Sequence, residues 1–112
     1  MKEGDVILVP LPQADGITKT RPAILLRTFP PFGDFLVCGI SAQLRQRVPD
    51  FDEIIDRQDA DFSISGLRQE SLIRSGFLAV FTRNQALGSI GEISSERHKG
   101  LLKRLAGYLI SN

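Results

Sequence analysis

The chain has 112 residues, of which 42% are hydrophobic and 24% charged, and its formal net charge is +1. A chain of this length buries a single modest core, so we expect one domain over residues 1–112. No stretch approaches the roughly 20 apolar residues of a membrane-spanning helix, and the first residues lack a signal-peptide pattern. We therefore expect a cytoplasmic protein with no membrane partner.

The charge is unevenly distributed along the chain. Between Val48 and Glu70, seven acidic residues stand against only two arginines, whereas the rest of the chain carries twelve basic and six acidic residues. The nearly neutral total therefore conceals a basic body and an acidic segment. A basic surface is compatible with a nucleic-acid partner, although a mixed solvated surface is the commoner explanation.

Apolar runs separated by turn signals predict short β-strands along most of the chain. The first, Val6–Val9, is ended by Pro10 and Pro12, which cannot donate to a strand ladder. Further strands are predicted over residues 21–28, 35–41, 54–55 (a short edge strand), 71–74, 77–81 and 87–91, with a turn at Ser75-Gly76 and a bulge or close approach in the last strand. A strand spacing of about ten residues favours a small barrel over alternating strands and helices.

The most apolar of these strands begins beside an arginine. Ala23 to Leu26 form an unbroken apolar run, which predicts a strand buried on both faces. Pro22 fixes its own φ and drives Arg21 toward extended geometry, so we expect Pro22 at the start of the strand. Arg21 is then either held at the end of a rigid strand or simply faces solvent, the commoner case for arginine.

The C-terminal segment has a different period. From Glu96 to Ile110, apolar side chains recur at steps of three and four residues, as on one face of a helix. Ser94 or Ser95 can cap its first turn. The predicted apolar face consists of Leu101, Leu102, Leu105, Tyr108 and Leu109. We expect this helix to close one side of the barrel.

The single cysteine and the single histidine offer little for catalysis. Cys38 lies inside an apolar run, which predicts a buried, unreactive thiol, and one cysteine excludes an intrachain disulfide or a cysteine-based zinc site. His98 stands beside Arg97 and Lys99, which predicts an exposed, charged helix face. No phosphate-binding glycine loop, nucleophile elbow or metal-ligand spacing is present, so we expect neither a metal nor a cofactor.

Polar side chains at the predicted strand ends suit phosphodiester chemistry. In this chemistry, a ribose 2′-hydroxyl attacks the neighbouring phosphodiester. The reaction needs a proton acceptor, a proton donor and groups that stabilise a charged phosphate, and it needs no cofactor. Arginine can stabilise charge on a phosphate, and a serine hydroxyl can hold a phosphate oxygen. The candidates are Arg21, Ser41, Gln43, Arg68, Glu70, Ser71 and Arg74.

Three blocks of the sequence resemble the MazF/PemK family of toxin ribonucleases. Gly4–Pro12, a polar loop and Thr20–Leu25 resemble the family's glycine-acid-hydrophobic strand, variable loop and arginine-proline-apolar strand. Cys38–Gln43 resembles its strand ending in serine or threonine, and Leu67–Arg74 is the third block. Together with the amphipathic helix that ends the chain, these blocks span nearly all of it in the family's order.

The resemblance implies a mainly β fold, a small SH3-like barrel of MazF/PemK (CcdB-like) architecture with a C-terminal amphipathic helix, that forms a homodimer. It also implies the toxin of a toxin–antitoxin pair, which inhibits growth by cutting single-stranded RNA without a metal. A cognate antitoxin would hold it inactive, and operator DNA would be bound only in complex with that antitoxin. The alternatives are a non-catalytic relative that binds nucleic acid or a partner protein, and a barrel of unrelated function.

The resemblance also suggests roles for individual residues. Arg21 matches the family's catalytic arginine, and Ser41 matches the hydroxyl residue that assists it. Some relatives carry a histidine or glutamate in the first loop, where this chain offers only Gln13, Asp15 and Lys19. Some also carry an acid before the fifth strand, where this chain places Arg68, with Glu70 two residues further on. The residue that accepts the proton therefore stays open. The residues expected to bind substrate are Lys19, Thr20, Gln43, Arg68, Glu70, Ser71 and Arg74.

Overall fold

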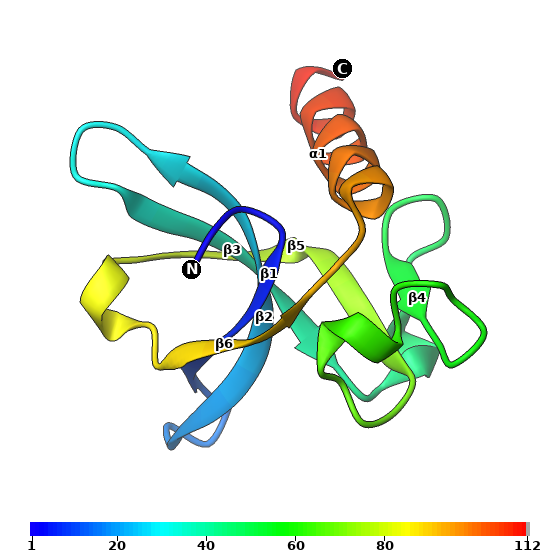
Figure 1. The fold of residues 1–112 in the computed structure, drawn as a ribbon, viewed down its shortest axis with the longest axis horizontal. Coiled ribbons are helices and arrows are strands. Elements are labelled where there is room, and N and C mark those ends of the chain that lie inside the picture. The colour runs from blue at the N-terminus through cyan, green and yellow to red at the C-terminus, as the bar shows by residue number, and fades with distance from the viewer. Residues whose placement is uncertain (112) are drawn as a thin grey trace.

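The computed structural model describes residues 1–111 as one six-stranded antiparallel sheet and one α-helix (Figure 1). The strands are β1 (Asp5–Pro12), β2 (Thr18–Phe29), β3 (Asp34–Ser41), β4 (Glu53–Ile55), β5 (Ser71–Phe81) and β6 (Gly88–Glu92), and the helix is α1 (Ser95–Ile110). Three short 3-10 helices, η1 (Leu44–Gln46), η2 (Ser63–Ser65) and η3 (Arg83–Gln85), lie in the connections. The predicted mainly β fold with a C-terminal helix is confirmed.

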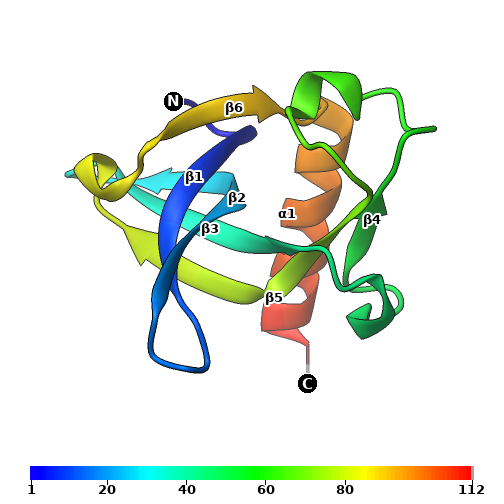
Figure 2. The ribbon, with the colours of Figure 1, turned by 90° about the horizontal axis from the view of Figure 1, so that it is seen from below.

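The sheet curls into a half-barrel. Its strand order is β4-β5-β3-β2-β1-β6, and Figure 2 shows β6 brought round toward η2, with α1 along one side. Gly91 of β6 allows the backbones to meet there, because a Cβ atom on it would lie 2.3 Å from the carbonyl oxygen of Ile64. As predicted, β4 is an edge strand, and β6 shifts register against β1 between Ser89 and Gly91.

The Ala23–Leu26 run of strand β2 is buried on both faces, as predicted. Alternate residues of a strand point to opposite faces, so Ile24 and Leu26 enter one apolar cluster while Ala23 and Leu25 enter another. The first cluster also contains Cys38 and the helix residues Leu101 and Leu105. Cys38 is fully buried, as predicted, and burial raises the pKa of its thiol to about 12.

The predicted start of β2 is wrong. The strand begins at Thr18, so Pro22 lies inside it and opposite Leu8 of β1. Pairing between β2 and β3 begins only at Ala23, which leaves the first residues of β2 with a single neighbouring strand. A proline is tolerated there for the same reason that it is tolerated on a sheet edge.

The predicted turn at Ser75-Gly76 is also wrong, because β5 continues through it. Arg74 pairs with Gly39 and Leu78 pairs with Cys38, so Ser75, Gly76 and Phe77 are inserted between consecutive pairs. We call these three residues the β5 bulge. A bulge bends a strand and turns its side chains without reversing the chain.

Helix α1 begins as predicted but is only partly covered. The Oγ atom of Ser94 accepts the N–H of Arg97 at 3.1 Å, which caps the first turn. Leu101 and Leu105 are buried, whereas Tyr108 and Leu109 of the same predicted face are 63% and 67% exposed. Within residues 1–111, no helix is both long enough and apolar enough to cross a membrane.

His98 does not lie on an exposed face, contrary to the prediction. It stands three residues before the buried Leu101 and therefore on the same side of α1. Its ring is half-buried, and the Nε2 atom lies 2.8 Å from the carbonyl oxygen of Leu26. A carbonyl oxygen only accepts, so Nε2 carries a proton and donates. His98 thus ties α1 to β2.

Three carboxylates of the acidic segment form an ion cluster with α1. Arg97 of α1 contacts Asp61 and Glu53 at 2.8 Å each and Asp59 at 3.3 Å. Arg104, two helical turns further along α1, also pairs with Glu53. These carboxylates therefore tie β4 and the following loop to the helix.

Candidate functional site

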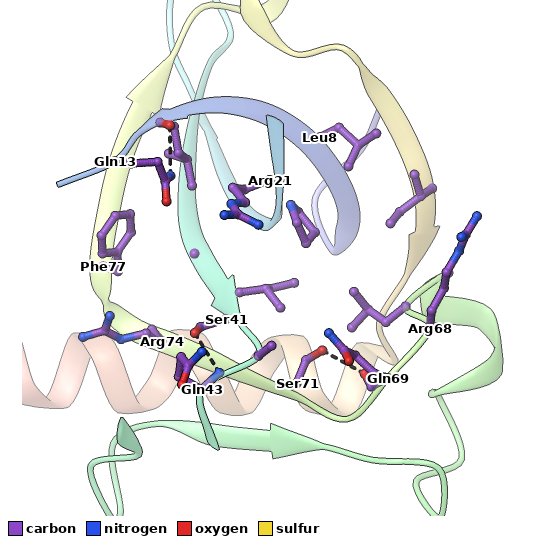
Figure 3. Close-up of a pocket in the computed structure, with 18 residues that line it drawn as sticks. Leu8, Gln13, Arg21, Ser41, Gln43, Arg68, Gln69, Ser71, Arg74 and Phe77 are labelled. Atoms are coloured by element: carbon purple, nitrogen blue, oxygen red, sulfur yellow. Dashed lines mark hydrogen bonds between the residues drawn. The ribbon is translucent and has the colours of Figure 1, made fainter. Parts of the chain in front are cut away.

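A cavity of about 550 Å³ opens among β1, β2, β3, β5 and the loop after η2 (Figure 3). It brings together side chains from distant parts of the sequence. Of the nine residues that the sequence analysis singles out, six line this cavity: Arg21, Ser41, Gln43, Arg68, Ser71 and Arg74.

Arg21 lies near the middle of the cavity (Figure 3). It stands two residues before Ala23, so strand alternation places its side chain on the face of β2 that carries Ala23 and Leu25. It is exposed, and it pairs with Val9 through the backbone ladder. The guanidinium therefore projects into open space from a strand that is otherwise held in the core.

The two serines of the cavity are engaged differently. The Oγ atom of Ser41, at the end of β3, accepts the N–H of Gln43 at 3.0 Å, so its own proton is free to be donated to a ligand. The hydroxyl of Ser71 instead donates to the carbonyl oxygen of Gln69 at 2.8 Å. Ser41 is thus the hydroxyl that is ready to donate, whereas Ser71 holds the loop before β5.

The charged groups that line the cavity are all positive. Its three guanidinium groups belong to Arg21, Arg68 and Arg74, and no carboxylate or imidazole is among the lining residues within the described chain. Among residues 1–111, none of these three arginines forms an ion pair with a carboxylate. Such a cavity attracts a polyanion, and the guanidinium fork matches the geometry of a phosphate group.

Three predicted site residues lie outside this lining. Lys19 and Thr20 are exposed on β2, opposite Leu11 and Pro10 of β1, and Glu70 is exposed in the loop before β5. Their part in binding substrate stays a prediction. Within residues 1–111, no group of three or more His, Cys, Asp or Glu residues could hold a metal ion.

The cavity also contains polar and aromatic residues that the sequence analysis does not name as site residues. Gln13 follows β1, and its Nε2 atom donates to the carbonyl oxygen of Leu11 at 3.2 Å. Gln69 lies inside the third motif block, between the predicted substrate-binding residues Arg68 and Glu70, so its place in the sequence could have identified it as a site residue. Phe77 carried no such signal, because it reaches the cavity only through the β5 bulge.

Comparison with known proteins identifies the fold. No protein-family model matches the sequence, and no curated protein matches it. The structure is similar to the toxin MazF-mt6 of Mycobacterium tuberculosis, with a TM-score of 0.70 and 16% identity over 96% of this chain and 98% of that chain. It is also similar to an endoribonuclease in complex with its cognate antitoxin from a mycobacterial species, with a TM-score of 0.70 and 12% identity over 97% of this chain and 94% of that one. The chain therefore has the MazF-like fold that its sequence motifs predict.

Proposed function

We propose that the protein is the toxin of a toxin–antitoxin pair and that it cuts single-stranded RNA in the cytoplasm without a metal ion. The observation that carries the proposal is the convergence of Arg21 and Ser41 in one acid-free cavity that also holds Arg68 and Arg74. The MazF-like fold supports the proposal, because both solved structures compared above are toxin or endoribonuclease structures.

The reaction uses the substrate's own nucleophile. The 2′-oxygen of a ribose attacks the adjacent phosphorus, a P–O2′ bond forms and the P–O5′ bond breaks, which leaves a 2′,3′-cyclic phosphate and a 5′-hydroxyl. Arg21 stabilises the extra negative charge on the phosphate oxygens in the transition state. Ser41 donates its hydroxyl proton in a hydrogen bond to one of these oxygens. Hydroxide takes the proton of the 2′-hydroxyl, and water returns one to the leaving 5′-oxygen.

A homodimer and a polypeptide antitoxin belong to the same proposal, as does operator DNA bound in complex with the antitoxin. The end of α1 supplies apolar surface for another chain, since Tyr108, Leu109 and Ile110 are all more than 60% exposed. One of the similar structures is an endoribonuclease with its cognate antitoxin. Light scattering at micromolar concentration tests the dimer, and a monomeric mass would contradict it.

The test is RNA cleavage by the purified protein and by two matched arginine variants. Arg21→Ala removes the guanidinium in the cavity, whereas Arg27→Ala removes an exposed guanidinium of the same strand that pairs with Glu3 outside it. Loss of one preorganised stabiliser typically costs a factor of about 10² to 10³ in rate. We expect that loss for Arg21→Ala alone, together with loss of growth arrest on induction. If folded Arg21→Ala cleaves at the parent rate, the proposed role of Arg21 is wrong.

A second function is favoured by one observation, the lack of any carboxylate or imidazole among the cavity-lining residues. A protein that only binds RNA needs the arginines but no proton acceptor. In that case, the parent protein binds single-stranded RNA and leaves it intact, and 2′-O-methyl RNA binds as tightly as RNA.

A further inference from the structure

We propose that Phe77 and Arg74 form a stacking platform for one nucleobase of the bound RNA, beside the phosphate site of Arg21 and Ser41. The inference deepens the proposed function and takes from it only that RNA occupies the cavity. It assigns a base-binding role to an aromatic residue that the sequence motifs did not mark.

Phe77 is an aromatic side chain left exposed inside a concave, positively charged site. Its ring lines the cavity and its residue is 41% exposed. One edge of the ring packs against Gly39 of β3, since a Cβ atom there would be 2.8 Å from the ring Cδ1 atom. Single-stranded nucleic acids are bound in this way elsewhere, by aromatic faces for the bases within a basic groove for the backbone.

The β5 bulge is what brings Phe77 to Arg74. Residues three apart in a regular strand point to opposite faces, so Arg74 and Phe77 would lie on opposite sides of the sheet. The insertion of residues 75–77 between the pairs Gly39–Arg74 and Cys38–Leu78 places both side chains on the cavity. The guanidinium carbon of Arg74 then lies over the ring, 5.7 Å from its centroid.

The ring and the guanidinium together suit a base better than they suit a phosphate alone. Bases stack on both aromatic rings and arginine planes, and the cation–π contact holds the guanidinium of Arg74 beside the ring of Phe77. Figure 3 shows the carboxamides of Gln13 and Gln43 along the same side of the cavity, where they offer hydrogen-bonding groups to the edge of a stacked base.

The absence of tryptophan from the chain allows a direct spectroscopic test. Phe77→Trp would introduce the only tryptophan, and a base stacked on an indole quenches its fluorescence. The probe is a single-stranded 2′-O-methyl oligonucleotide, in which the methyl group blocks attack by the 2′-oxygen. We expect quenching by this oligonucleotide, and none by inorganic phosphate or by an oligonucleotide of abasic residues. The matched control is Phe32→Trp, at a position 84% exposed and outside the cavity, which should not be quenched.

A second variant tests the energetics without adding bulk. Phe77→Leu keeps an apolar contact with Gly39 but removes the aromatic face. It should weaken binding of the same oligonucleotide roughly tenfold to a hundredfold. It should leave the salt dependence of binding unchanged, because no phosphate contact is lost, whereas Arg74→Ala should reduce that dependence.

The outcomes separate this inference from the proposed function. If Phe77→Leu binds the oligonucleotide as tightly as the parent does, the platform does not exist. The same holds if the abasic oligonucleotide quenches Phe77→Trp as strongly as the 2′-O-methyl oligonucleotide does. Neither result would contradict the proposed RNA cleavage, provided that cleavage depends on Arg21. If the parent does not cleave RNA but the quenching and affinity results hold, the platform stands and the proposed catalysis is wrong.

Discussion

Asp52 holds the backbone of Ser75. The Oδ1 atom of Asp52 accepts the N–H of Ser75 at 3.1 Å, and its Oδ2 atom accepts the N–H of Val48 at 3.0 Å. Asp52 is only 5% exposed, so water competes little for these bonds. Because Ser75 begins the β5 bulge, a carboxylate from the segment before β4 fixes the part of β5 that presents Arg74 and Phe77 to the cavity.

The first prediction follows from that contact. Asp52→Ala would leave the buried N–H of Ser75 without its partner, which costs about 1–3 kcal/mol of unfolding free energy. The bulge should also lose its fixed shape, so binding of the 2′-O-methyl oligonucleotide should weaken. Urea denaturation and oligonucleotide titration measure the two effects. Asp52→Asn keeps one carbonyl acceptor and should lose less stability, and unchanged binding in Asp52→Ala would contradict the positioning role.

The second prediction concerns Ser41. It is neutral and offers one hydrogen bond, so Ser41→Ala should slow single-turnover RNA cleavage by roughly tenfold to a hundredfold, or about 1.4–2.7 kcal/mol of barrier. That loss is smaller than the one expected for Arg21→Ala. Both side chains lie outside the apolar clusters, so both variants should melt near the parent temperature. Ser63→Ala, on the exposed surface of η2, is the control and should cleave at the parent rate.

The third prediction concerns the proton acceptor. Since no carboxylate or imidazole is among the cavity-lining residues described, we expect hydroxide to take the proton of the 2′-hydroxyl. The logarithm of the cleavage rate should then rise with pH with a slope near one between about pH 5.5 and 8.5, with no plateau. A plateau in this range, measured by single-turnover kinetics on the folded protein, would reveal a titrating base and overturn the assignment.

The fourth prediction concerns the ion cluster around Arg97. Burial raises the pKa of Asp61, but the hydrogen bonds from Arg97 and from the N–H of Ser94 outweigh it, so the pKa lies below its ordinary value. A carboxyl group whose pKa is lower in the folded state stabilises the fold above its unfolded pKa of about 3.9, and this stability is lost as the pH falls through the folded value. Thermal unfolding should therefore show a loss of stability below about pH 4.

The matched variants for that cluster are Arg97→Met and Lys103→Met. Arg97→Met leaves the carboxylate of Asp61 buried without its cation, which should lower the free energy of unfolding by about 3–5 kcal/mol at pH 7. Mild acid should then destabilise this variant less than the parent, because protonation removes the unpaired buried charge. Lys103 is exposed on the same helix, so its loss should change stability little. If Arg97→Met matched the parent at pH 7, the cluster would contribute no net stability.

The sequence by itself determined the features that depend on short-range patterns. The apolar run of Ala23–Leu26 predicted a strand buried on both faces, and a serine, Ser94 or Ser95, before the leucine period predicted the capped helix α1. The motifs around Arg21 and Ser41 predicted the MazF-like fold that the structural comparisons then confirmed. Each signal is contained in a few neighbouring residues, since burial period, capping and proline stiffness act locally.

Only the tertiary structure decided what depends on pairing between distant segments. The register between β3 and β5 turned the expected Ser75-Gly76 turn into a bulge and carried Phe77 into the cavity. The packing of α1 against β2 left the ring of His98 half-buried and in contact with the carbonyl oxygen of Leu26. The same long-range contacts left Lys19 outside the cavity lining although it lies two residues from Arg21. Strand register and helix docking are set by the sum of many non-local contacts, which no window of neighbouring residues contains.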